Sequence, residues 1–336
     1  MKQNYFIGID ISKEKVDIAL LNQEGLLLLE KVIGNEKTKL ANTFSAILRK
    51  HKIPAEQVLF CCEATGIYTT PLKQVMSRQG WTLWIENAYK IKKASFDMRG
   101  KTDQKDARRI AEYAMRYNDR QVEYKAPEPI QEQLHTLLSA RETLIDQVVR
   151  LKQQLSESKK HDPFKHKLLK SSFAATLKML AKEIKRIELQ TKELIVENEP
   201  IAKNVKLLTS IPGIGLQNAL NFIVYTRNFT LFENANQLCC YAGVVPFPTQ
   251  SGMMQKRDRV SQFANKKLKT LIHLAAISAS RMKGEIREYY IRKVKEGKNK
   301  MSVLNAIRCK LVKRMFAIIM RQTPYAVSPE HIFSSN

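Results

Sequence analysis

The sequence predicts an α/β domain at the N-terminus followed by two mainly helical regions, so that the overall class is α/β plus α. Three features support this prediction: short apolar runs between turn residues in the first part, a regular apolar repeat in the middle, and helical patterns joined by a Pro-Gly turn in the last part. The 336 residues are enough for two or three domains with a sizeable core. We expect these domains at residues 1–125, 126–200 and 201–336.

The first domain is expected to begin with three short strands between residues 4 and 33, because apolar runs alternate there with polar turns. The elements expected next are a helix with Leu40, Phe44, Ile47 and Leu48 on one face, a strand over 58–62, a helix over 68–80, a strand over 81–85, a basic loop over 89–101 and a helix over 102–116. Three meandering strands followed by this alternation are the order of a ribonuclease-H-like fold.

Four acidic residues occupy distinctive positions in this domain. Asp10 and Glu63 each end an apolar strand, whereas Asp103 and Asp106 lie three residues apart at the start of the last helix and share one face. In a ribonuclease-H-like order, all four would point into one cleft. Carboxylate oxygens suit Mg²⁺, and two such ions can stabilise the attacking and leaving oxygens of a phosphodiester. The alternative for each residue is a surface charge or a helix cap.

An apolar stripe with heptad spacing runs through the middle region, and Arg141 is its one exception. The stripe consists of Ile130, Leu134, Leu137, Leu144, Val148, Leu151 and Leu155, then Phe173, Leu177, Leu180, Ile184, Ile187, Thr191 and Leu194. It predicts an antiparallel hairpin of two helices joined at a polar break over 156–163. The hairpin is either an ordinary helical core or a coiled coil through which subunits associate, and the charged remaining faces favour the coiled coil.

The last region contains the turn Ile211-Pro212-Gly213-Ile214-Gly215 between two helical patterns. This arrangement resembles a helix–hairpin–helix, in which backbone N–H groups at the turn bind a phosphate. Such turns also join ordinary core helices, but the net charge of the chain favours phosphate binding at Gly213 and Gly215.

The charge of the chain points to a polyanionic partner. Lys and Arg number 57 against 32 Asp and Glu, for a formal charge of +25, and nucleic acid is the commonest polyanion. No apolar segment approaches the ~20 residues that span a bilayer. The N-terminus has no signal-peptide core, so we expect a cytoplasmic protein. The five cysteines lie mostly in apolar runs without metal-binding spacing, so we expect neither disulfides nor a structural zinc.

A second group of residues with chemical potential lies far downstream, in a loop bounded by prolines. It comprises a serine before a glycine and three cations: Ser251, Gly252, Lys256, Arg257 and Arg259. A serine beside cations can attack a phosphate while the cations stabilise the developing charge. From residue chemistry alone, a serine that only turns the backbone is the more common case.

Taken together, these motifs resemble the DEDD-type insertion-sequence transposases, the "one-ten" family, also called bridge-RNA-guided recombinases. The matching motifs follow the family's order over nearly the whole chain: Gly8-Ile9-Asp10 with Lys13, Glu63-Ala64-Thr65-Gly66, 101–107, 211–215, Gly243-Val244-Val245-Pro246 through Ser251-Gly252, and 264–268. The motifs around Asp103 and from Pro246 to Gly252 are specific, whereas the Pro-Gly turn is not. One departure is Ala264, where many members have glycine.

The resemblance implies a RuvC-like domain in which Asp10, Glu63, Asp103 and Asp106 bind Mg²⁺ or Mn²⁺, and a transposase domain in which Ser251 is the nucleophile. In such enzymes the serine forms a covalent phosphoserine link to DNA and permits strand exchange. A structured RNA pairs with the donor and target DNA. The resemblance also implies dimers or tetramers in the bacterial cytoplasm, associated with the nucleoid, and a composite site to which the carboxylates and the serine both belong.

The residues expected to contact nucleic acid are Lys101, Lys105, Gly213, Gly215, Lys256, Arg257, Arg259, Asn265, Lys266 and Lys267. Two other functions stay open. A RuvC-type junction nuclease would hydrolyse DNA with the carboxylates while Ser251 is structural. A nucleic-acid-binding protein that has lost catalysis would need neither group, but the complete set of acids argues against it.

Overall fold

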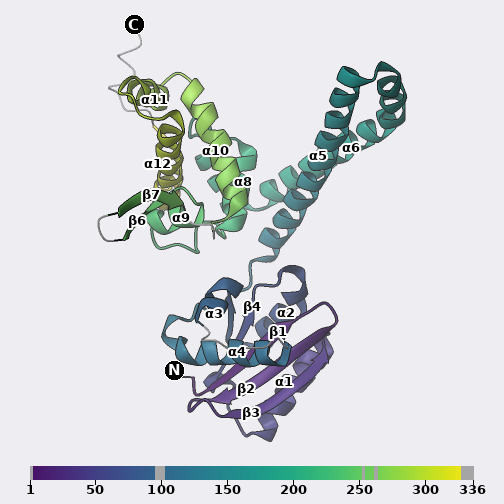
Figure 1. Ribbon diagram of the computed structural model, residues 1–336, viewed down its shortest axis with the longest axis vertical. Coiled ribbons are helices and arrows are strands. Elements are labelled where there is room, and N and C mark those ends of the chain that lie inside the picture. The colour runs from purple at the N-terminus through teal and green to yellow at the C-terminus, as the bar shows by residue number, and fades with distance from the viewer. Residues whose placement is uncertain (1–2, 95–102, 252–253, 261–263, 327–336) are drawn as a thin grey trace. The chain divides into compact units, whose positions relative to one another are not determined.

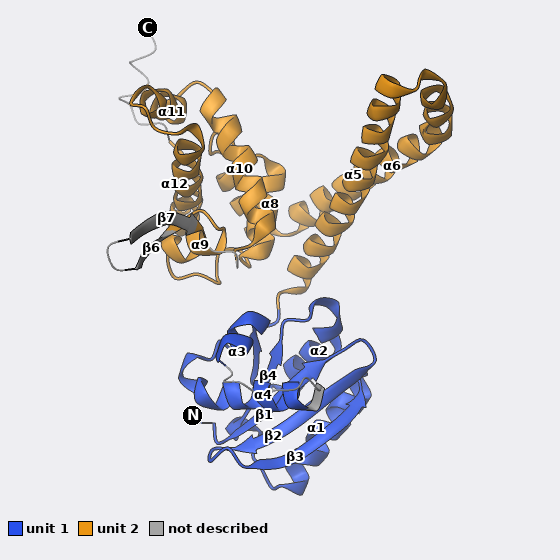
Figure 2. Cartoon of the chain, in the orientation of Figure 1, with its two compact units in different colours: residues 1–126 blue, residues 127–336 orange. Residues whose placement is uncertain are grey.

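The structure is a computed structural model that describes residues 3–94, 103–251, 254–260 and 264–326, with 103–104, 247–251 and 254–259 described by their backbone alone. The chain forms two compact units, residues 1–126 and 127–336 (Figure 1; Figure 2). Unit 1 contains a sheet, and unit 2 consists mainly of helices.

Unit 1 is built on a five-stranded mixed sheet with the order β3-β2-β1-β4-β5. β2 runs antiparallel to β1 and β3, whereas β4 and β5 run parallel to β1. The α/β class predicted for this part of the chain is therefore confirmed. The strands are β1 (Tyr5–Ile11), β2 (Lys15–Asn22), β3 (Leu27–Gly34), β4 (Val58–Glu63) and β5 (Leu83–Glu86).

Helices cover both faces of this sheet, and Figure 1 shows α4 lying across one of them. The helices are α1 (Lys37–Lys50), α2 (Thr70–Gln79), α3 (Ala88–Ala94) and α4 (Asp103–Arg116). Ile7 and Phe60 share a core with α1 and α2, whereas Phe6 and Leu59 share another core with α3 and α4. Successive residues of β1 and β4 thus point to opposite faces, as the period of two in a strand requires.

A close contact between β1 and α4 determines where α4 lies. A Cβ atom at Gly8 would lie 2.1 Å from the carbonyl oxygen of Ala107 and 2.3 Å from the backbone nitrogen of Ala111. The helix backbone therefore rests directly on the strand. Ala107 and Ala111 are themselves buried, so small residues on both elements allow this approach.

One segment of unit 1 differs from its sequence prediction. The sequence predicts a basic loop over 89–101, but the described part of this segment forms α3. The lysines suggest an exposed loop, yet Ile91 is fully buried, and the Asn87 side chain accepts a hydrogen bond from the backbone N–H of Tyr89 at 2.9 Å. One buried apolar residue and one polar residue at the helix start suffice to hold this short helix in a folded context.

Unit 2 begins with two long helices, α5 (Pro129–His161) and α6 (Pro163–Glu197), which pack along each other (Figure 1). The predicted polar break over 156–163 is helical except at Asp162, whose carboxylate accepts a hydrogen bond from Lys165 N and caps α6. The turn that joins the two helices thus lies within the predicted range but is shorter than it, because Ser, Glu and Lys are tolerated in an exposed helix. Arg141, the exception in the apolar stripe, pairs across the hairpin with Glu188 at 2.8 Å.

The rest of unit 2 is organised around its last helix, α12, which packs against α7, α9, α10 and α11 and shares one apolar core with them. The elements are α7 (Glu199–Thr209), α8 (Leu216–Tyr225), α9 (Ala235–Tyr241), β6 (Pro246–Ser251), β7 (Met254–Val260), α10 (Lys266–Arg281), α11 (Glu285–Lys295) and α12 (Lys300–Arg321). The β6–β7 hairpin replaces the loop predicted around Ser251. Its prolines disfavour a strand in general, but a two-stranded hairpin has free edges that tolerate them.

Two further properties of the fold bear on function. Within the residues described, no helix is both long and apolar enough to cross a bilayer. The five cysteines are free thiols.

We predict that Gly8→Ala strongly destabilises unit 1, because the added methyl group would overlap the α4 backbone. The expected loss is at least about 1–3 kcal/mol of unfolding free energy, the usual cost of overpacking a core. Urea unfolding followed by circular dichroism measures it. Gly34→Ala is the matched control, since the atoms nearest to a Cβ there belong to the flexible side chains of Lys39 and Glu36, at 3.2–3.3 Å. Equal losses in the two variants would contradict the proposed role of Gly8.

Candidate active site

Two parallel strands place carboxylates on the face of the sheet that α4 covers. Asp10 lies two residues after Gly8 in β1, and Glu63 lies two residues after Cys61 in β4. Gly8 contacts α4 and Cys61 belongs to the core shared with α4. Asp10 and Glu63 therefore point to the same side. Because Gly8 pairs with Cys61 in the β1–β4 register, Asp10 and Glu63 are neighbours at the carboxyl ends of these strands.

The contact at Gly8 also brings Asp106 towards this edge, since Asp106 precedes Ala107 in α4. Burial raises the pKa of Glu63; the Arg109 charge lowers it and the Asp106 charge raises it. These influences place Glu63 in the electrostatic neighbourhood of both α4 residues. The structure thus brings Asp10, Glu63 and Asp106 to one face of unit 1.

Arg109 moderates the negative charge of this face. Its Nη2 lies 2.6 Å from Asp106 Oδ1, and its Nε is buried without a hydrogen-bond partner. The Arg108-Arg109 pair suggests a solvated basic surface in the sequence, so sequence reasoning missed Arg109. Only the packing of α4 on the sheet turns this arginine towards the carboxylates.

Two further carboxylates extend the row, and sequence reasoning missed both. Asp17 pairs with Asp10 in the β1–β2 register, and Glu86 pairs with Glu63 in the β4–β5 register. Asp17 is 3% exposed and Glu86 is 8% exposed. Glu86 could have been found, because it ends an apolar strand as Glu63 does. Asp17 lies inside a strand and gives no such signal.

Partners in the fold compensate the charges of these two acids. Glu86 accepts hydrogen bonds from Asn87 N at 2.6 Å and from the Tyr113 hydroxyl at 3.3 Å, and Lys90 Nζ lies 3.2 Å away. Burial and the Glu86 charge raise the pKa of Tyr113 to about 12, so this hydroxyl stays a donor at neutral pH. Asp17 lies 3.5 Å from Lys15 Nζ. We therefore interpret Glu86 and Asp17 as structural carboxylates.

The donor set on this face suits a divalent cation. Asp10, Glu63 and Asp106 offer only oxygen ligands, which Mg²⁺ prefers. A dication would favour the ionised form of Glu63, whose pKa is raised by burial and, to a smaller extent, by the Asp106 charge. Asp103 begins α4, but its side chain lies outside the described part of the chain. The whole of Lys101 lies outside it as well. Among the side chains that are described, no three Asp, Glu, His or Cys residues lie close enough to hold a metal ion.

The second predicted group lies on the β6–β7 hairpin of unit 2. Ser251 is the last residue of β6, and Gly252 lies outside the described residues. Lys256, Arg257 and Arg259 lie on β7, the strand paired with β6. The backbone register therefore places these three cations on the strand beside the one that carries the serine.

Residues 243 and 264–265, which flank the hairpin in sequence, pack closely against each other and their neighbours. Gly243 has a φ of +67°, and a Cβ there would lie 2.4 Å from the Ala264 methyl carbon. Asn265 accepts a hydrogen bond from Leu268 N at 3.0 Å, which caps α10, and its Nδ2 donates to the Tyr241 hydroxyl at 3.1 Å. Asn265 was predicted to contact nucleic acid, but both polar atoms of its side chain already form hydrogen bonds within the fold. Ala264, the departure from the family pattern, packs at the same junction.

The two lysines that begin α10 differ in their surroundings. Lys266 is exposed, whereas Lys267 forms an ion pair with Glu142 of α5. Lys105, in the first turn of α4, is exposed. Lys266 and Lys105 are thus accessible to a polyanion, whereas part of the Lys267 charge is already compensated.

The Pro-Gly turn between α7 and α8 contains one glycine that packing requires. Gly213 has a φ of +89°, and a Cβ there would lie 2.7 Å from the carbonyl oxygen of Ala275 in α10. Gly215 precedes α8, and a Cβ there would meet nothing within 4 Å. Close packing against α10 thus accounts for Gly213, whereas the backbone at Gly215 is open to a ligand.

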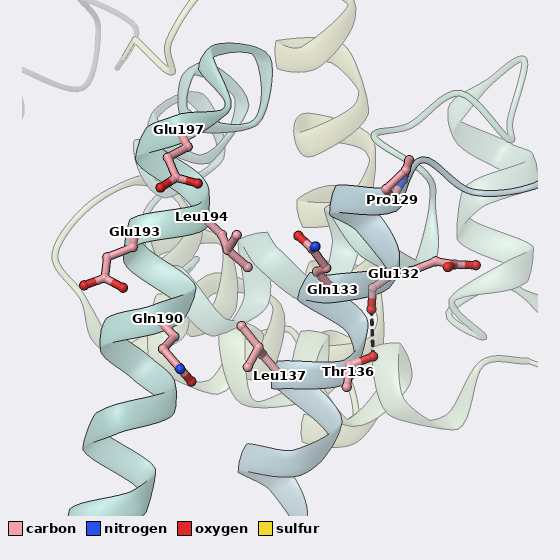
Figure 3. Close-up of a pocket in the computed structure, with 9 residues that line it drawn as sticks. All are labelled: Pro129, Glu132, Gln133, Thr136, Leu137, Gln190, Glu193, Leu194 and Glu197. Atoms are coloured by element: carbon pink, nitrogen blue, oxygen red, sulfur yellow. Dashed lines mark hydrogen bonds between the residues drawn. The ribbon is translucent and has the colours of Figure 1, made fainter.

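A groove of about 670 Å³ lies between α5 and α6 (Figure 3). Glu132, Glu193 and Glu197 line it together with apolar side chains such as Leu137 and Leu194, and none of its lining residues is basic. Carboxylates repel phosphates, so this groove is not a candidate nucleic-acid site.

Comparison with known proteins places both groups of residues within transposase sequences. Residues 7–158 match the DEDD-type IS110 transposases, and residues 205–291 match the family described as transposase IS116/IS110/IS902. The chain is 24% identical to the pilin gene-inverting proteins of Moraxella lacunata and Moraxella bovis, over 95% of this chain and 97% of theirs. It is 27% identical to a protein of insertion element IS110 from Streptomyces coelicolor, over 46% of this chain and 37% of that one.

We predict that Glu63→Gln raises the melting temperature of the metal-free protein at pH 7. The pKa of this carboxyl is higher in the folded state than in the unfolded chain, so its ionised form destabilises the fold at neutral pH. The gain is expected to stay below about 1 kcal/mol, because the group is only partly buried. It should vanish as the pH falls below about 4.3, where both states are protonated.

Thermal unfolding in EDTA between pH 3.5 and 8 measures this effect. Glu56→Gln, at an exposed position of the same unit, is the control and should change stability by less than about 0.5 kcal/mol. A lower melting temperature for Glu63→Gln than for the native chain at pH 7 would show that the carboxylate does not carry the expected burial cost.

Proposed function

This chain belongs to the IS110 family of DEDD transposases, which are enzymes of DNA recombination, and from that membership we propose that it cleaves and exchanges DNA strands with Ser251 as nucleophile. The observation that carries the proposal is the grouping of Asp10, Glu63 and Asp106 on one face of the sheet, in a chain of net charge +25. Such a chain attracts DNA, and such a face suits phosphodiester chemistry.

The DEDD family uses a divalent metal, and we propose that the ion here is Mg²⁺, with Mn²⁺ as a substitute. Asp10, Glu63, Asp103 and Asp106 would hold it, and when bound it would supply positive charge to the phosphate oxygens. The fold contributes the placement of these groups: β1 and β4 fix the first two, and α4 carries the others. Arg109 lowers the repulsion around Asp106 through its ion pair at 2.6 Å.

We propose that the serine reaction conserves the number of phosphodiester bonds. The Ser251 oxygen forms a bond to phosphorus while the bond from phosphorus to one DNA strand breaks, and that strand leaves with a free hydroxyl. The hydroxyl of an incoming strand then attacks the phosphoserine and releases the serine. Lys256, Arg257 and Arg259 on the paired strand would offset the charge that develops on the phosphate.

A hydrolytic junction nuclease is the second candidate. The carboxylates of unit 1 could activate water without any contribution from Ser251. Such an enzyme would release free DNA ends and form no protein–DNA link. The two candidates therefore differ in one observable, the covalent intermediate.

We predict that a denaturing gel with labelled DNA shows a protein-linked strand, and that Ser251→Ala removes both this product and strand exchange. Loss of a nucleophile typically lowers the rate by about a thousandfold or more. Thr249→Val removes another hydroxyl from the same strand and should leave the product intact. Full recombination by Ser251→Ala would exclude the serine mechanism. Free cleaved ends without any linked strand would favour the nuclease.

We further propose that the partners are donor and target DNA, a structured guide RNA and other copies of this chain. The hairpin of α5 and α6, within residues 126–200, would join the subunits. Its exposed apolar side chains, such as Leu189 at 57% and Val196 at 79%, support this role. Exposed Lys105 and Lys266, together with the open backbone at Gly215, are the proposed contacts to nucleic acid backbones. Sedimentation of the protein–DNA complex as a single copy would contradict the association of subunits.

Guidance by RNA predicts that target choice follows the RNA and not the protein. Strand exchange should require an RNA transcribed from the non-coding DNA beside the gene. Changing the bases of one RNA loop should redirect exchange to the matching DNA, because base pairing would read the sequence. An RNA with the same composition in scrambled order is the control. Equal exchange with scrambled RNA, or without RNA, would contradict guidance.

A further inference from the structure

The C-terminal unit contains a buried arginine that has no counter-ion among the described residues. Arg308, in the middle of α12, is only 8% exposed, and its Nε is buried without a hydrogen-bond partner. Its helix neighbours Ile307 and Leu311 are fully buried in the apolar core. By contrast, the Nη2 atom of Arg314 on the same helix donates to both carboxylate oxygens of Glu285, at 2.7 and 2.6 Å. Within the described ranges, Arg308 has no such acidic partner.

A buried Nε–H without an acceptor, on a side chain that carries a charge, is costly in this position. Arginine stays protonated at neutral pH, even though burial lowers the pKa of Arg308 from its high usual value. Removing a charge from water without a partner costs several kcal/mol in general, so buried charges normally have a counter-ion. A buried donor without a partner commonly marks a site for a bound water or ion.

A second buried polar atom without a partner lies on the helix that packs against α12. The Nδ1 atom of His273, on α10, is buried without a hydrogen-bond partner, and α10 packs against α12. Burial and the Arg308 charge lower the pKa of His273, so the imidazole is neutral at neutral pH. A neutral imidazole with its proton on Nδ1 is a donor, as is the guanidinium Nε. In that tautomer both unpartnered atoms are donors, and one acceptor could serve both.

Both helices also contact the loop that leads to Ser251. Asn305, one turn before Arg308, donates to the Val244 carbonyl oxygen at 3.0 Å. Lys269, one turn before His273, has its Cδ 3.3 Å from the position of a Cβ at Gly243. One turn is about 5.4 Å along a helix. Arg308 and His273 therefore lie about one turn from the backbone that continues into β6.

We infer that Arg308 and His273 form a binding site for a phosphate-type oxyanion. Its oxygens would accept from the guanidinium Nε and from the imidazole Nδ1, and its charge would offset that of Arg308. The ligand is either a phosphate of a nucleic-acid backbone or free inorganic phosphate. The first case rests on the proposed function, since it would position the DNA or RNA strand near the serine-bearing hairpin. The anion site itself does not depend on that function.

Thermal unfolding of the full chain with increasing inorganic phosphate tests the site, with chloride of equal ionic strength as the reference. We expect phosphate to raise the melting temperature beyond chloride. In Arg308→Met the apparent affinity for phosphate should fall about tenfold or more, the usual loss for a charge-assisted hydrogen bond. The variant should fold at least as well as the native chain in chloride, because an apolar side chain replaces a buried charge.

Two further variants complete the test. Lys313→Met removes one exposed cation from the same helix, so it lowers diffuse attraction equally and should change the apparent phosphate affinity by less than about twofold. Arg308→Lys keeps the charge but not the Nε donor, so phosphate should raise its melting temperature much less than that of the native chain. This variant tests the site even if Arg308→Met does not fold. The inference is overturned if phosphate raises the melting temperature of the native chain no more than chloride does, which is the result expected if water fills the site. It is also overturned if Arg308→Met and Lys313→Met behave alike.

Binding of a labelled oligonucleotide separates the two sources of phosphate. If Arg308→Met weakens oligonucleotide binding more than Lys313→Met does, the site takes a backbone phosphate. If only inorganic phosphate binding is lost, the site takes a free anion. An intact phosphate effect in a protein that never exchanges DNA strands would contradict the proposed function and leave the anion site standing.

Discussion

The contact of Gly8 with the backbone of α4 is the constraint on which the geometry of the first unit depends. A strand and a helix normally keep side chains between them, but here the Ala107 carbonyl would lie 2.1 Å from a Cβ on the strand. This approach fixes both the height and the register of α4 along β1. Asp106 is thereby held near Glu63, while β1 itself carries Asp10. One missing side chain thus couples the sheet acids to the helix acids.

The cost of grouping these acids is visible in their electrostatics. Burial and the neighbouring Asp106 raise the pKa of Glu63, and Arg109 only partly opposes them. The outer members of the row differ, because Glu86 has three donors around it and Asp17 has Lys15. The fold compensates the charges at the edges of the row. Glu63, at its centre, keeps its raised pKa, which is consistent with the proposal that it binds a metal ion.

The second unit also contains one compensated and one uncompensated charge, but there the charges are positive. Arg314 has its acid, Glu285, whereas Arg308 is buried among apolar residues beside His273. A chain selected only for stability would replace such a charge with an apolar side chain. Retention of the charge is understandable if an anion completes the site. Uncompensated groups in both units thus coincide with the chemistry of a transposase: carboxylates for a cation, and cations for phosphates.

The sequence by itself indicated the α/β unit, the helical hairpin and the positions of Asp10 and Glu63 near strand ends, because strand ends and helix periodicity are local patterns. It also placed Ser251 among cations. It did not reveal α3 or the β6–β7 hairpin, since lysines and prolines concealed them, nor the single-residue turn at Asp162. Only the tertiary structure decided that Asp17 and Glu86 join the row, that Gly213 is needed for packing, and that the Arg308 Nε lacks a partner among the described residues. Each of these depends on which residues meet across strands or between helices, and such contacts join positions far apart in the chain that no local pattern records.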